Sequence, residues 1–139
     1  MNTSTLKFSL TGPAGALEAL LDLPPDGVAP RGTAVIAHPH PLFGGTMDNK
    51  VVQTIARAFV LSGWRAVRFN FRGVGASAGA YDEGRGELQD LLAVVAHSAP
   101  EGALALAGFS FGAFVTSHAV VALAARDPAA VVLVGTAAS

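Results

Sequence analysis

The sequence contains no cysteine, and this absence removes several kinds of chemistry at once. Without a thiol there is no disulfide, no thiolate nucleophile and no cysteine-ligated zinc or iron–sulfur site. Charged residues are also scarce, at 14% of 139 residues, and the net charge is -1 at pH 7. Such a chain has no basic face for a nucleic-acid backbone and no polybasic anchor for an anionic membrane. We therefore expect neither nucleic acid nor membrane among its partners.

Long apolar runs are missing too, although hydrophobic residues make up 51% of the chain. The most apolar segments, residues 119–125 and 129–138, are separated by Arg126, Asp127 and Pro128. Neither reaches the roughly 18 residues that a membrane span requires. The N-terminus has no basic region followed by an apolar stretch, so we expect a cytoplasmic protein that begins with a strand. Length and hydrophobic content together predict one domain, residues 1–139, with a large core.

The first two predicted strands are residues 5–10 and 17–23, and they flank a turn-forming Gly-Pro-Ala-Gly segment. Proline and glycine supply the geometry of a tight turn, so these strands should form an antiparallel hairpin. Strand and helix patterns alternate along the rest of the chain. We expect strands at residues 33–37, 66–71, 103–107 and 130–134, and helices at residues 48–62, 83–98 and 111–125.

This alternation is typical of right-handed crossovers, which join parallel strands through helices on both faces of a sheet. The predicted fold is therefore α/β, a three-layer sandwich with a mostly parallel sheet and an N-terminal antiparallel hairpin. Glycine-rich or polar segments follow the predicted parallel strands at residues 38–45, 72–79, 108–112 and 135–139. Because the carboxyl ends of parallel strands meet at one edge, these segments should lie together where α/β proteins build their sites.

Two of these segments match the pattern Gly-x-Ser-x-Gly, and their surroundings distinguish them. Ser110, in GFSFG, directly follows a predicted strand and directly precedes a predicted helix. That is the context of a nucleophile elbow, whose sharp turn lifts the hydroxyl out and points helix amides at the substrate. Ser77, in GASAG, lies six residues past its strand with no immediate helix. We predict Ser110 as the nucleophile, the alternative being a glycine-lined turn that only lets a helix pack on a strand.

Acyl transfer also needs two donors for the developing oxyanion, the amide after the nucleophile and one from an earlier loop. The Phe111 N–H is the first candidate. In the loop HPHPL, Pro39 and Pro41 have no amide hydrogen, so we favour the His40 N–H as the second donor, with Leu42 in reserve. Alternatively the prolines only rigidify the loop, and the imidazoles are solvated or bonded to carbonyls.

Metal and nucleotide binding are weaker alternatives. His38 and His40 have no identified third ligand, so we expect no metal site. Gly73 and Gly75 follow a strand as in a dinucleotide-binding loop, but the third glycine of G-x-G-x-x-G comes one residue late. We expect no cofactor.

The charged residues near the second glycine-rich loop suggest structure more than chemistry. Arg72 could orient this loop or steer an anionic substrate, although an exposed structural arginine is the simpler interpretation. Four acidic residues that follow are interpreted as helix N-terminal and solvent-facing charges, namely Asp82, Glu83, Glu87 and Asp90.

Three segments, HPHPLFGGTMDNKVV from residue 38, FNFRGVGAS from residue 69 and GFSFG, occur in this order. With them the chain resembles the α/β-hydrolase superfamily, and more narrowly the small, lid-poor bacterial hydrolases related to dienelactone hydrolase. The resemblance covers essentially the whole chain and corresponds to the N-terminal part of such proteins. It implies Ser110 as nucleophile and Phe111 with the His40 region as oxyanion donors. It also implies a supporting loop that contains His38, Arg72, Gly73 and Gly75.

The departure from the family pattern concerns the rest of the triad. Family members continue through further strands, with the acid and the histidine after the serine, whereas only His118 and Asp127 follow Ser110 with suitable chemistry. His118 lies eight helical residues on, about 12 Å along the axis. Asp127 is at the far end of the same helix. We therefore expect the triad acid and histidine to lie beyond residue 139.

These observations predict a serine hydrolase for small ester or acyl substrates, incomplete within residues 1–139. The alternatives are a non-catalytic truncated α/β domain and a nucleotide-binding module. A final strand at residues 130–134 would leave an exposed sheet edge, which favours self-association.

Overall fold

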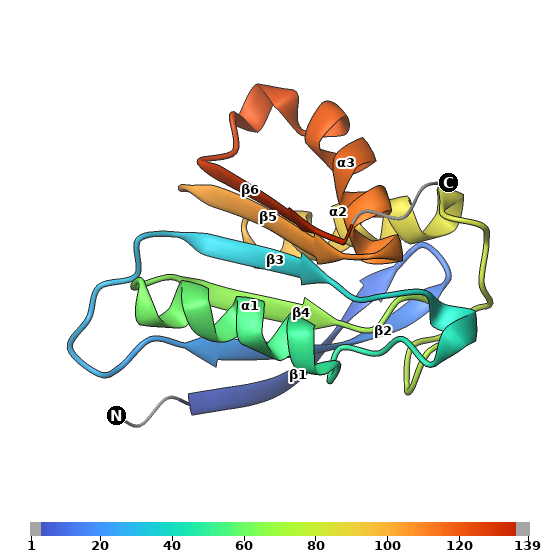
Figure 1. The fold of residues 1–139 in the computed structure, drawn as a ribbon, viewed down its shortest axis with the longest axis horizontal. Helices are drawn as coiled ribbons and strands as arrows, with labels where there is room; N and C mark the ends of the chain where they lie inside the picture. The colour runs from blue at the N-terminus through green and yellow to red at the C-terminus, as the bar shows by residue number, and fades with distance from the viewer. Residues whose placement is uncertain (1–3, 136–139) are drawn as a thin grey trace.

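A computed structural model describes residues 4–135, which form one six-stranded sheet with helices on both faces (Figure 1). The strands are β1 (Ser4–Gly12), β2 (Gly15–Leu23), β3 (Thr33–Ala37), β4 (Arg65–Phe69), β5 (Leu104–Phe109) and β6 (Ala130–Val134). The helices are α1 (Lys50–Leu61), α2 (Arg85–Ser98) and α3 (Phe111–Ala122), with short 3₁₀ turns at Pro41–Phe43 and Ala124–Arg126. No helix among these residues is long and apolar enough to cross a membrane.

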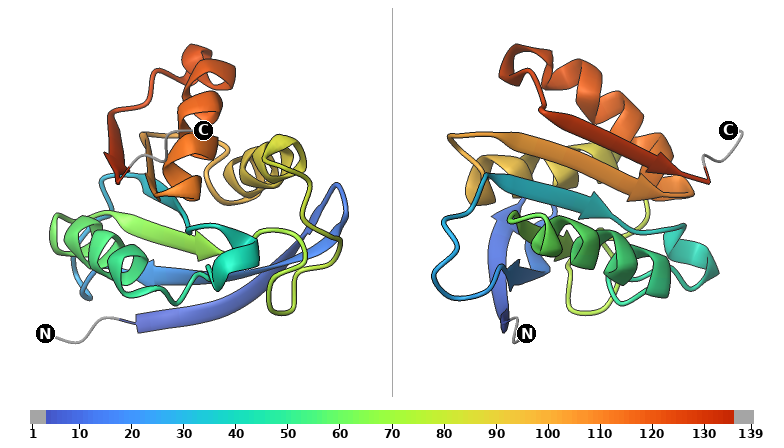
Figure 2. Two further views of the ribbon diagram at one scale, coloured as in Figure 1. Left: turned by 45° about the vertical axis from the view of Figure 1, so that its right-hand side comes forward. Right: turned by 60° about the vertical axis from the view of Figure 1, so that its left-hand side comes forward.

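The strand order is β1-β2-β4-β3-β5-β6. β1 and β2 form the predicted antiparallel hairpin, closing at Gly12 opposite Gly15, and β2 is antiparallel to β4. The other neighbours are parallel, so the carboxyl ends of β4, β3, β5 and β6 share one edge. α1 covers one face, and α2 and α3 cover the other (Figure 2). The predicted three-layer α/β fold is confirmed.

The helix boundaries follow from local chemistry. The Asn49 side chain caps α1 by accepting from the N–H groups of Val51 and Val52, at 2.9 and 3.2 Å. Gly63, with φ 91°, turns the chain after α1, as the sequence predicts. α3 ends at Ala122, three residues earlier than expected, because residues 124–126 tighten into a 3₁₀ turn before the left-handed Asp127.

The core has two parts, one on each face of the sheet. The larger part lies beneath α2 and α3 and includes Phe69, Phe71 and Leu106, which are fully buried. The smaller part lies beneath α1, where Ile36, Val52 and other aliphatic side chains pack together. Both parts fix β3 between its neighbours, and β3 therefore holds its following loop rigidly at the carboxyl edge.

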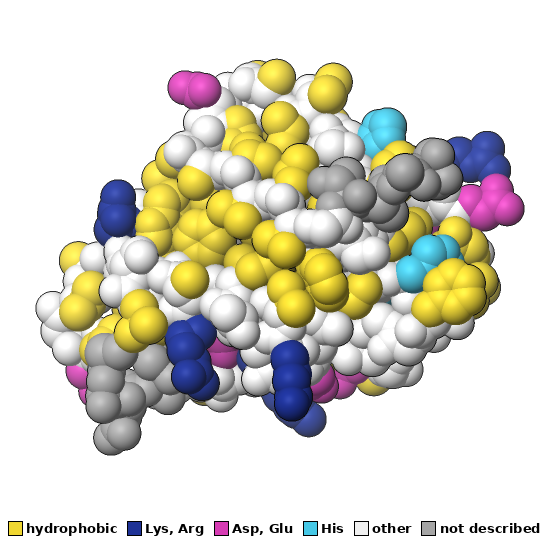
Figure 3. Space-filling view, in the orientation of Figure 1, with side chains coloured by type: hydrophobic (Ala, Val, Ile, Leu, Met, Phe, Trp, Pro, Cys, Tyr) yellow, Lys and Arg dark blue, Asp and Glu magenta, His cyan; other side chains and the backbone are white. Residues whose placement is uncertain are grey.

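β6 is the edge strand of the sheet in the part of the chain that the structure describes. Val131, Val132 and Leu133 are each about two-fifths exposed, at 41%, 37% and 40%. Hydrophobic side chains gather above α1 on this face of the molecule (Figure 3). Exposed apolar groups on an edge strand favour association, and self-association through this edge stays a prediction.

Candidate active site

Ser110 occupies the one-residue turn between β5 and α3. Its backbone has φ 57° and ψ -119°, a region that non-glycine residues rarely adopt. The Ser110 N–H donates to the Val134 carbonyl at 2.9 Å, which ties the turn to β6. Strain of this kind persists where the surrounding structure enforces it, often at functional sites. The strand, strained serine and helix match the predicted nucleophile elbow in form.

Glycines on either side of Ser110 allow three backbones to meet. A Cβ on Gly108 would lie 2.4 Å from the Gly112 carbonyl oxygen, and one on Gly112 would lie 2.2 Å from the Ala37 carbonyl oxygen. Both distances are too short for a side-chain carbon. The N-terminus of α3 is therefore pressed against the end of β3, which brings the following HPHPL loop next to the elbow.

The loop and the helix also meet through aromatic rings. The His40 ring lies 4.8 Å from the Phe111 ring, which in turn lies 6.0 Å from Tyr81 and 5.7 Å from Phe71. The Leu42 N–H donates to His40 Nδ1 at 3.1 Å, so the neutral imidazole carries its proton on Nε2 and donates to the Tyr81 hydroxyl at 3.2 Å. These contacts hold the His40 backbone beside the N-terminus of α3.

The reserve donor, the Leu42 N–H, already has a hydrogen-bond acceptor, whereas the two favoured oxyanion donors have none among the described residues. Leu42 N–H is bonded to the His40 ring, which argues against it as a donor to substrate. Within residues 4–135, neither Phe111 N–H nor His40 N–H has a hydrogen-bond acceptor. Phe111 is the first residue of α3, whose leading amides point out of the helix. The pairing of Phe111 with His40 stays a prediction, and this geometry favours it over Leu42.

His38 is fully buried and uses both ring nitrogens. Its Nε2 accepts from the Phe71 N–H at 3.1 Å, so Nδ1 carries the proton and donates to the Pro39 carbonyl at 2.6 Å. Because both nitrogens are occupied, this ring is not available to a metal. The Pro39 carbonyl belongs to the same peptide group as the His40 N–H, so His38 fixes the direction of that N–H. The loops after β3 and β4 are thereby joined.

Burial lowers the pKa of His38 from 6.5 to about 4, and the hydrogen bond to Pro39 only partly offsets this. An unfolded chain takes up the proton near pH 6.5, but the folded protein does not until pH 4, so stability falls as pH decreases between these values. We expect the shifted pKa of His38 to lower the free energy of unfolding by about 3 kcal/mol as the pH falls from 6.5 to 4. Urea unfolding at pH 7 and pH 4 measures the loss.

The variant His38→Gln should lose this component of the pH dependence, and the exposed-site control His118→Gln should keep it. Equal pH dependence in the two variants would contradict the assignment of the proton to His38.

Ser77, the serine of the second Gly-x-Ser-x-Gly segment, is a structural link. It is only 6% exposed, its Oγ donates to the Asn70 carbonyl at 2.7 Å, and it accepts from the Glu18 N–H at 2.9 Å. Gly75 in this loop has φ 54°, and a Cβ there would lie 2.6 Å from side-chain atoms of both Asn70 and Glu18. Gly73 also has positive φ, at 78°. The loop supports the sheet edge without offering a free hydroxyl.

The interpretation of Arg72 as an exposed arginine is wrong, as is that of Asp90 and Glu87 as solvent-facing charges. The Arg72 side chain is 13% exposed and that of Asp90 0%. Asp90 accepts from the Arg72 backbone N–H at 2.9 Å and from its guanidinium at 2.9 Å. These hydrogen bonds raise the pKa of Arg72. The first turns of α2 lie over the Arg72 loop, which removes both charges from water.

Glu87 is buried because it completes the start of α2. Its two carboxylate oxygens accept from the N–H groups of Asp82 and Gly84, each at 2.8 Å. A carboxylate bonded to free amides at a helix N-terminus is favourable even when it is buried. Glu87 lies at the N-terminus of the helix, as predicted from the sequence, but its burial was not predicted.

Among the described residues, no histidine forms a hydrogen bond with Ser110. His97 ends α2 near the amino ends of the parallel strands, and His118 is exposed on α3 with its ring 4.9 Å from Phe114. The position of His118, along α3 from Ser110, is as predicted. Among residues 4–135, no cluster of three or more His, Asp or Glu side chains could hold a metal ion.

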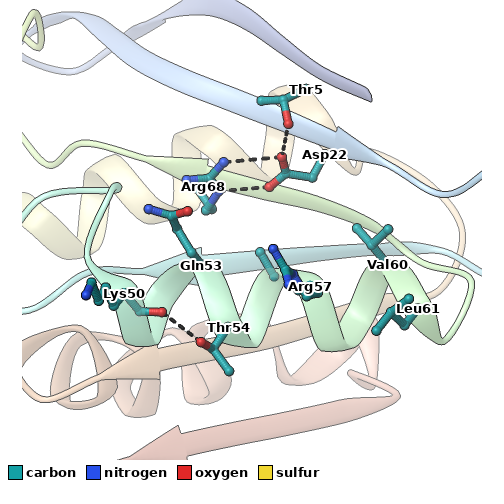
Figure 4. A pocket seen from close by; sticks show the side chains of 10 residues that line it. Thr5, Asp22, Lys50, Gln53, Thr54, Arg57, Val60, Leu61 and Arg68 are labelled. Atoms are coloured by element: carbon teal, nitrogen blue, oxygen red, sulfur yellow. Dashed lines mark hydrogen bonds and ion pairs between the residues drawn. The ribbon is translucent and has the colours of Figure 1, made fainter. Parts of the chain in front are cut away.

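Two cavities of the described structure lie away from Ser110. The larger, of about 740 Å³, lies between α1 and the hairpin, above the ion pair of Arg68 and Asp22 (Figure 4).

The elbow at the carboxyl edge of this sheet defines the class, an α/β hydrolase. Similar solved structures include an α/β serine hydrolase without a lid from Xanthomonas campestris, 44% identical, with a TM-score of 0.83, covering 96% of this chain and 62% of that one. An alpha-beta serine hydrolase homologue from Coxiella burnetii is 48% identical, with a TM-score of 0.77, over 83% of this chain and 56% of that one. The predicted resemblance to lid-poor bacterial hydrolases is confirmed.

The chain belongs to the family described as X-Pro dipeptidyl-peptidase (S15 family), whose model matches residues 17–139. A curated relative, an uncharacterized protein of Rickettsia prowazekii (strain Madrid E), is 38% identical over 114 residues, which are 79% of this chain and 47% of that protein. The chain thus spans about half to three-fifths of the length of these relatives.

Proposed function

We propose that Ser110 is the nucleophile of a serine hydrolase that cleaves small carboxylic esters or related acyl compounds. The observation that most strongly supports this proposal is the strained Ser110 backbone, with φ 57°, between the end of β5 and the first amide of α3. This arrangement sets the half-buried serine beside the first amides of α3, which a turn that serves only packing does not require. The relationship to α/β serine hydrolases supports the same chemistry.

In the proposed reaction, Ser110 Oγ attacks the acyl carbon while a general base takes the hydroxyl proton. The carbonyl oxygen becomes an oxyanion that accepts from Phe111 N–H and His40 N–H. Collapse of this intermediate expels the alcohol, which takes the proton back from the base, and leaves an acyl-serine. Water then attacks the acyl-serine and releases the acid. These steps need no cofactor.

We further propose that the base and its acid partner are supplied from outside residues 1–139. Two observations support this. None of the described histidines contacts Ser110, and the chain spans only 62% of its similar Xanthomonas structure. The rival nucleotide-binding function gains no support, because the Gly73 loop leads into no helix N-terminus: α2 begins only at Arg85.

Fluorophosphonate labelling of the full-length protein tests Ser110, because the probe reacts with an activated, accessible serine. We expect Ser110→Ala to abolish labelling. The control Ser117→Ala removes a hydroxyl from the same helix that only bonds the Phe114 carbonyl, and it should leave labelling unchanged. Labelling that persists in folded Ser110→Ala protein would show that the nucleophile is another residue.

A further inference from the structure

The side chain of His40 caps the 3₁₀ turn that follows β3. The Leu42 N–H donates to His40 Nδ1 at 3.1 Å. The N–H groups of Phe43 and Gly45 donate to the His40 carbonyl, at 3.1 and 3.0 Å. Pro41, the residue between His40 and Leu42, has no amide hydrogen. His40 therefore accepts from three amides of this turn, two through its carbonyl and one through its ring.

Only a neutral imidazole can accept the bond from Leu42. Nδ1 accepts through a lone pair, and in the imidazolium form a proton occupies that lone pair. The other ring nitrogen, Nε2, lies 3.2 Å from the Tyr81 hydroxyl and carries the proton of the neutral ring. Protonation of His40 therefore makes Nδ1 a donor and leaves two N–H groups facing each other. One of the two groups must then turn away.

Neither group can turn without loosening the loop. The His40 ring is half-buried, and its centroid lies 4.7 Å from the ring of Phe43, 4.8 Å from that of Phe111 and 4.9 Å from that of Tyr81. If the ring turns, it gives up these contacts, including the one to Phe111, the first residue of α3. If the Leu42 peptide turns instead, the 3₁₀ turn loses its cap.

No carboxylate is paired with the His40 ring within residues 4–135. Residues 41–45 of its own turn and residues 111–117 of α3 have no ionisable side chain. The third segment packed against the ring carries four such side chains, namely Tyr81, Asp82, Glu83 and Glu87. The pKa of Tyr81 is raised, first by burial and then by the charges of Glu87 and Glu83. Glu87 is bound to backbone amides and Glu83 faces an arginine, so neither carboxylate is bonded to an imidazolium at position 40.

We propose that the His40 imidazole is a positioning group for the oxyanion loop, and that it has this role only while it is neutral. The inference rests on the proposed function, in which the His40 N–H donates to the oxyanion. The ring and this N–H belong to one residue, and the ring holds that residue against Phe111, the other proposed donor. Hydrolysis then requires two unprotonated groups, the His40 ring and the general base that takes the Ser110 proton.

Asn49 shows which residue can replace the ring. Its backbone, with φ -54° and ψ 138°, is close to that of His40, with φ -55° and ψ 124°. Its side-chain oxygen accepts from the N–H two residues on, that of Val51, at 2.9 Å. His40 Nδ1 accepts from Leu42 with the same spacing. The variant His40→Asn should therefore keep the acceptor and lose the titrating proton, whereas His40→Ala loses both.

Nuclear magnetic resonance on the full-length protein tests the ring without reference to catalysis. Above the titration midpoint of His40, the ring should carry its proton on Nε2. Below that midpoint, the hydrogen-exchange protection of the Leu42 amide should fall about fivefold or more, because the amide loses its acceptor. In His40→Asn the protection should stay constant over the same range. A proton on Nδ1 of the neutral ring, or a Leu42 amide that does not respond to the ring, would overturn the proposal.

The pH profile of ester hydrolysis by the full-length protein tests the consequence for the reaction. Because two groups must be unprotonated, kcat/KM should fall about a hundredfold per pH unit below both midpoints. For His40→Asn, the fall from its own plateau should be only about tenfold per unit. The control His118→Gln, at an exposed position of α3, should keep the slope of the parent protein. At the plateau, His40→Asn should be more active than His40→Ala, because only Asn restores the acceptor.

Failure of the positioning role is distinguishable from failure of the proposed function. If fluorophosphonate labels Ser110 but the parent profile falls only tenfold per unit through the His40 midpoint, His40 does not control the oxyanion loop and the proposal is overturned. The same holds if His40→Asn keeps the slope of the parent protein. If Ser110 is not labelled, the proposed function fails, and with it the assignment of His40 to an oxyanion loop.

Discussion

Residues 1–139, produced on their own, should hydrolyse p-nitrophenyl acetate about a million-fold more slowly than a serine hydrolase with a complete triad. We expect this because we propose that the general base lies outside residues 1–139. A serine hydroxyl is a weak nucleophile until a neighbouring group takes its proton. What would remain is the roughly 10³–10⁴-fold acceleration over water that an oxyanion hole and binding provide alone.

The positions of the four histidines support this expectation. His38 has both nitrogens engaged, one with Phe71 N–H and the other with the Pro39 carbonyl. His40 is bonded at Nδ1 to Leu42 and at Nε2 to Tyr81. A base role for His40 would therefore require it to release Tyr81 and turn toward Ser110. The other two histidines lie on α2 and α3 without contact to the elbow.

The measurement compares this chain with its Ser110→Ala variant. Both should show the same slow rate, within the error of the assay. Robust turnover that depends on Ser110 would show that a base exists within residues 1–139 or is lent by another copy of the chain. Tyr81→Phe would then examine His40, because it removes one of the two hydrogen bonds that hold the ring, and a change in the Ser110-dependent rate would show that His40 takes part.

The order of strands and helices was predictable because the hydrophobic pattern agrees along the chain with the positions of the glycines that mark turns. Residues 33–37 form a continuous apolar run, and β3 is indeed buried throughout. Ser110 was recognisable because a strand ends at the residue before it and a helix begins at the residue after it. Such local signals do not depend on which strands pair.

Features that depend on tertiary pairing could not be predicted. The burial of Asp90 results from α2 lying over the Arg72 loop, and the two residues are 18 positions apart. The pairing of Thr33 with Arg65 across β3 and β4 is fixed only by the sheet order. His38 illustrates an intermediate case: a bond to a carbonyl was one of the two expected roles, but its full burial beside Phe71 was not.

The buried ion pair of Arg72 and Asp90 should be the largest single contributor to stability among the charged side chains. Asp90→Asn keeps the shape of the side chain and leaves the Arg72 guanidinium, 13% exposed, without its counter-charge. Removing one partner of a buried pair costs about 3–5 kcal/mol. We expect urea unfolding at pH 7 to show a loss of this size. The exposed pair of Arg85 and Glu83, 3.7 Å apart, provides the control, and Glu83→Gln should change stability little.

A double variant distinguishes the lost charge pair from general damage to the loop. Replacing both partners with apolar residues, as in Arg72→Met with Asp90→Leu, removes the uncompensated charge and should recover part of the loss. Recovery should stay incomplete, because the Arg72 backbone N–H also donates to Asp90 at 2.9 Å and would lose its acceptor. If the double variant is less stable than Asp90→Asn, the main contribution of Asp90 is its hydrogen bond to the backbone of this loop. If Asp90→Asn alone is as stable as Glu83→Gln, the pair is accessible to water and its burial plays no part in holding the loop beneath α2.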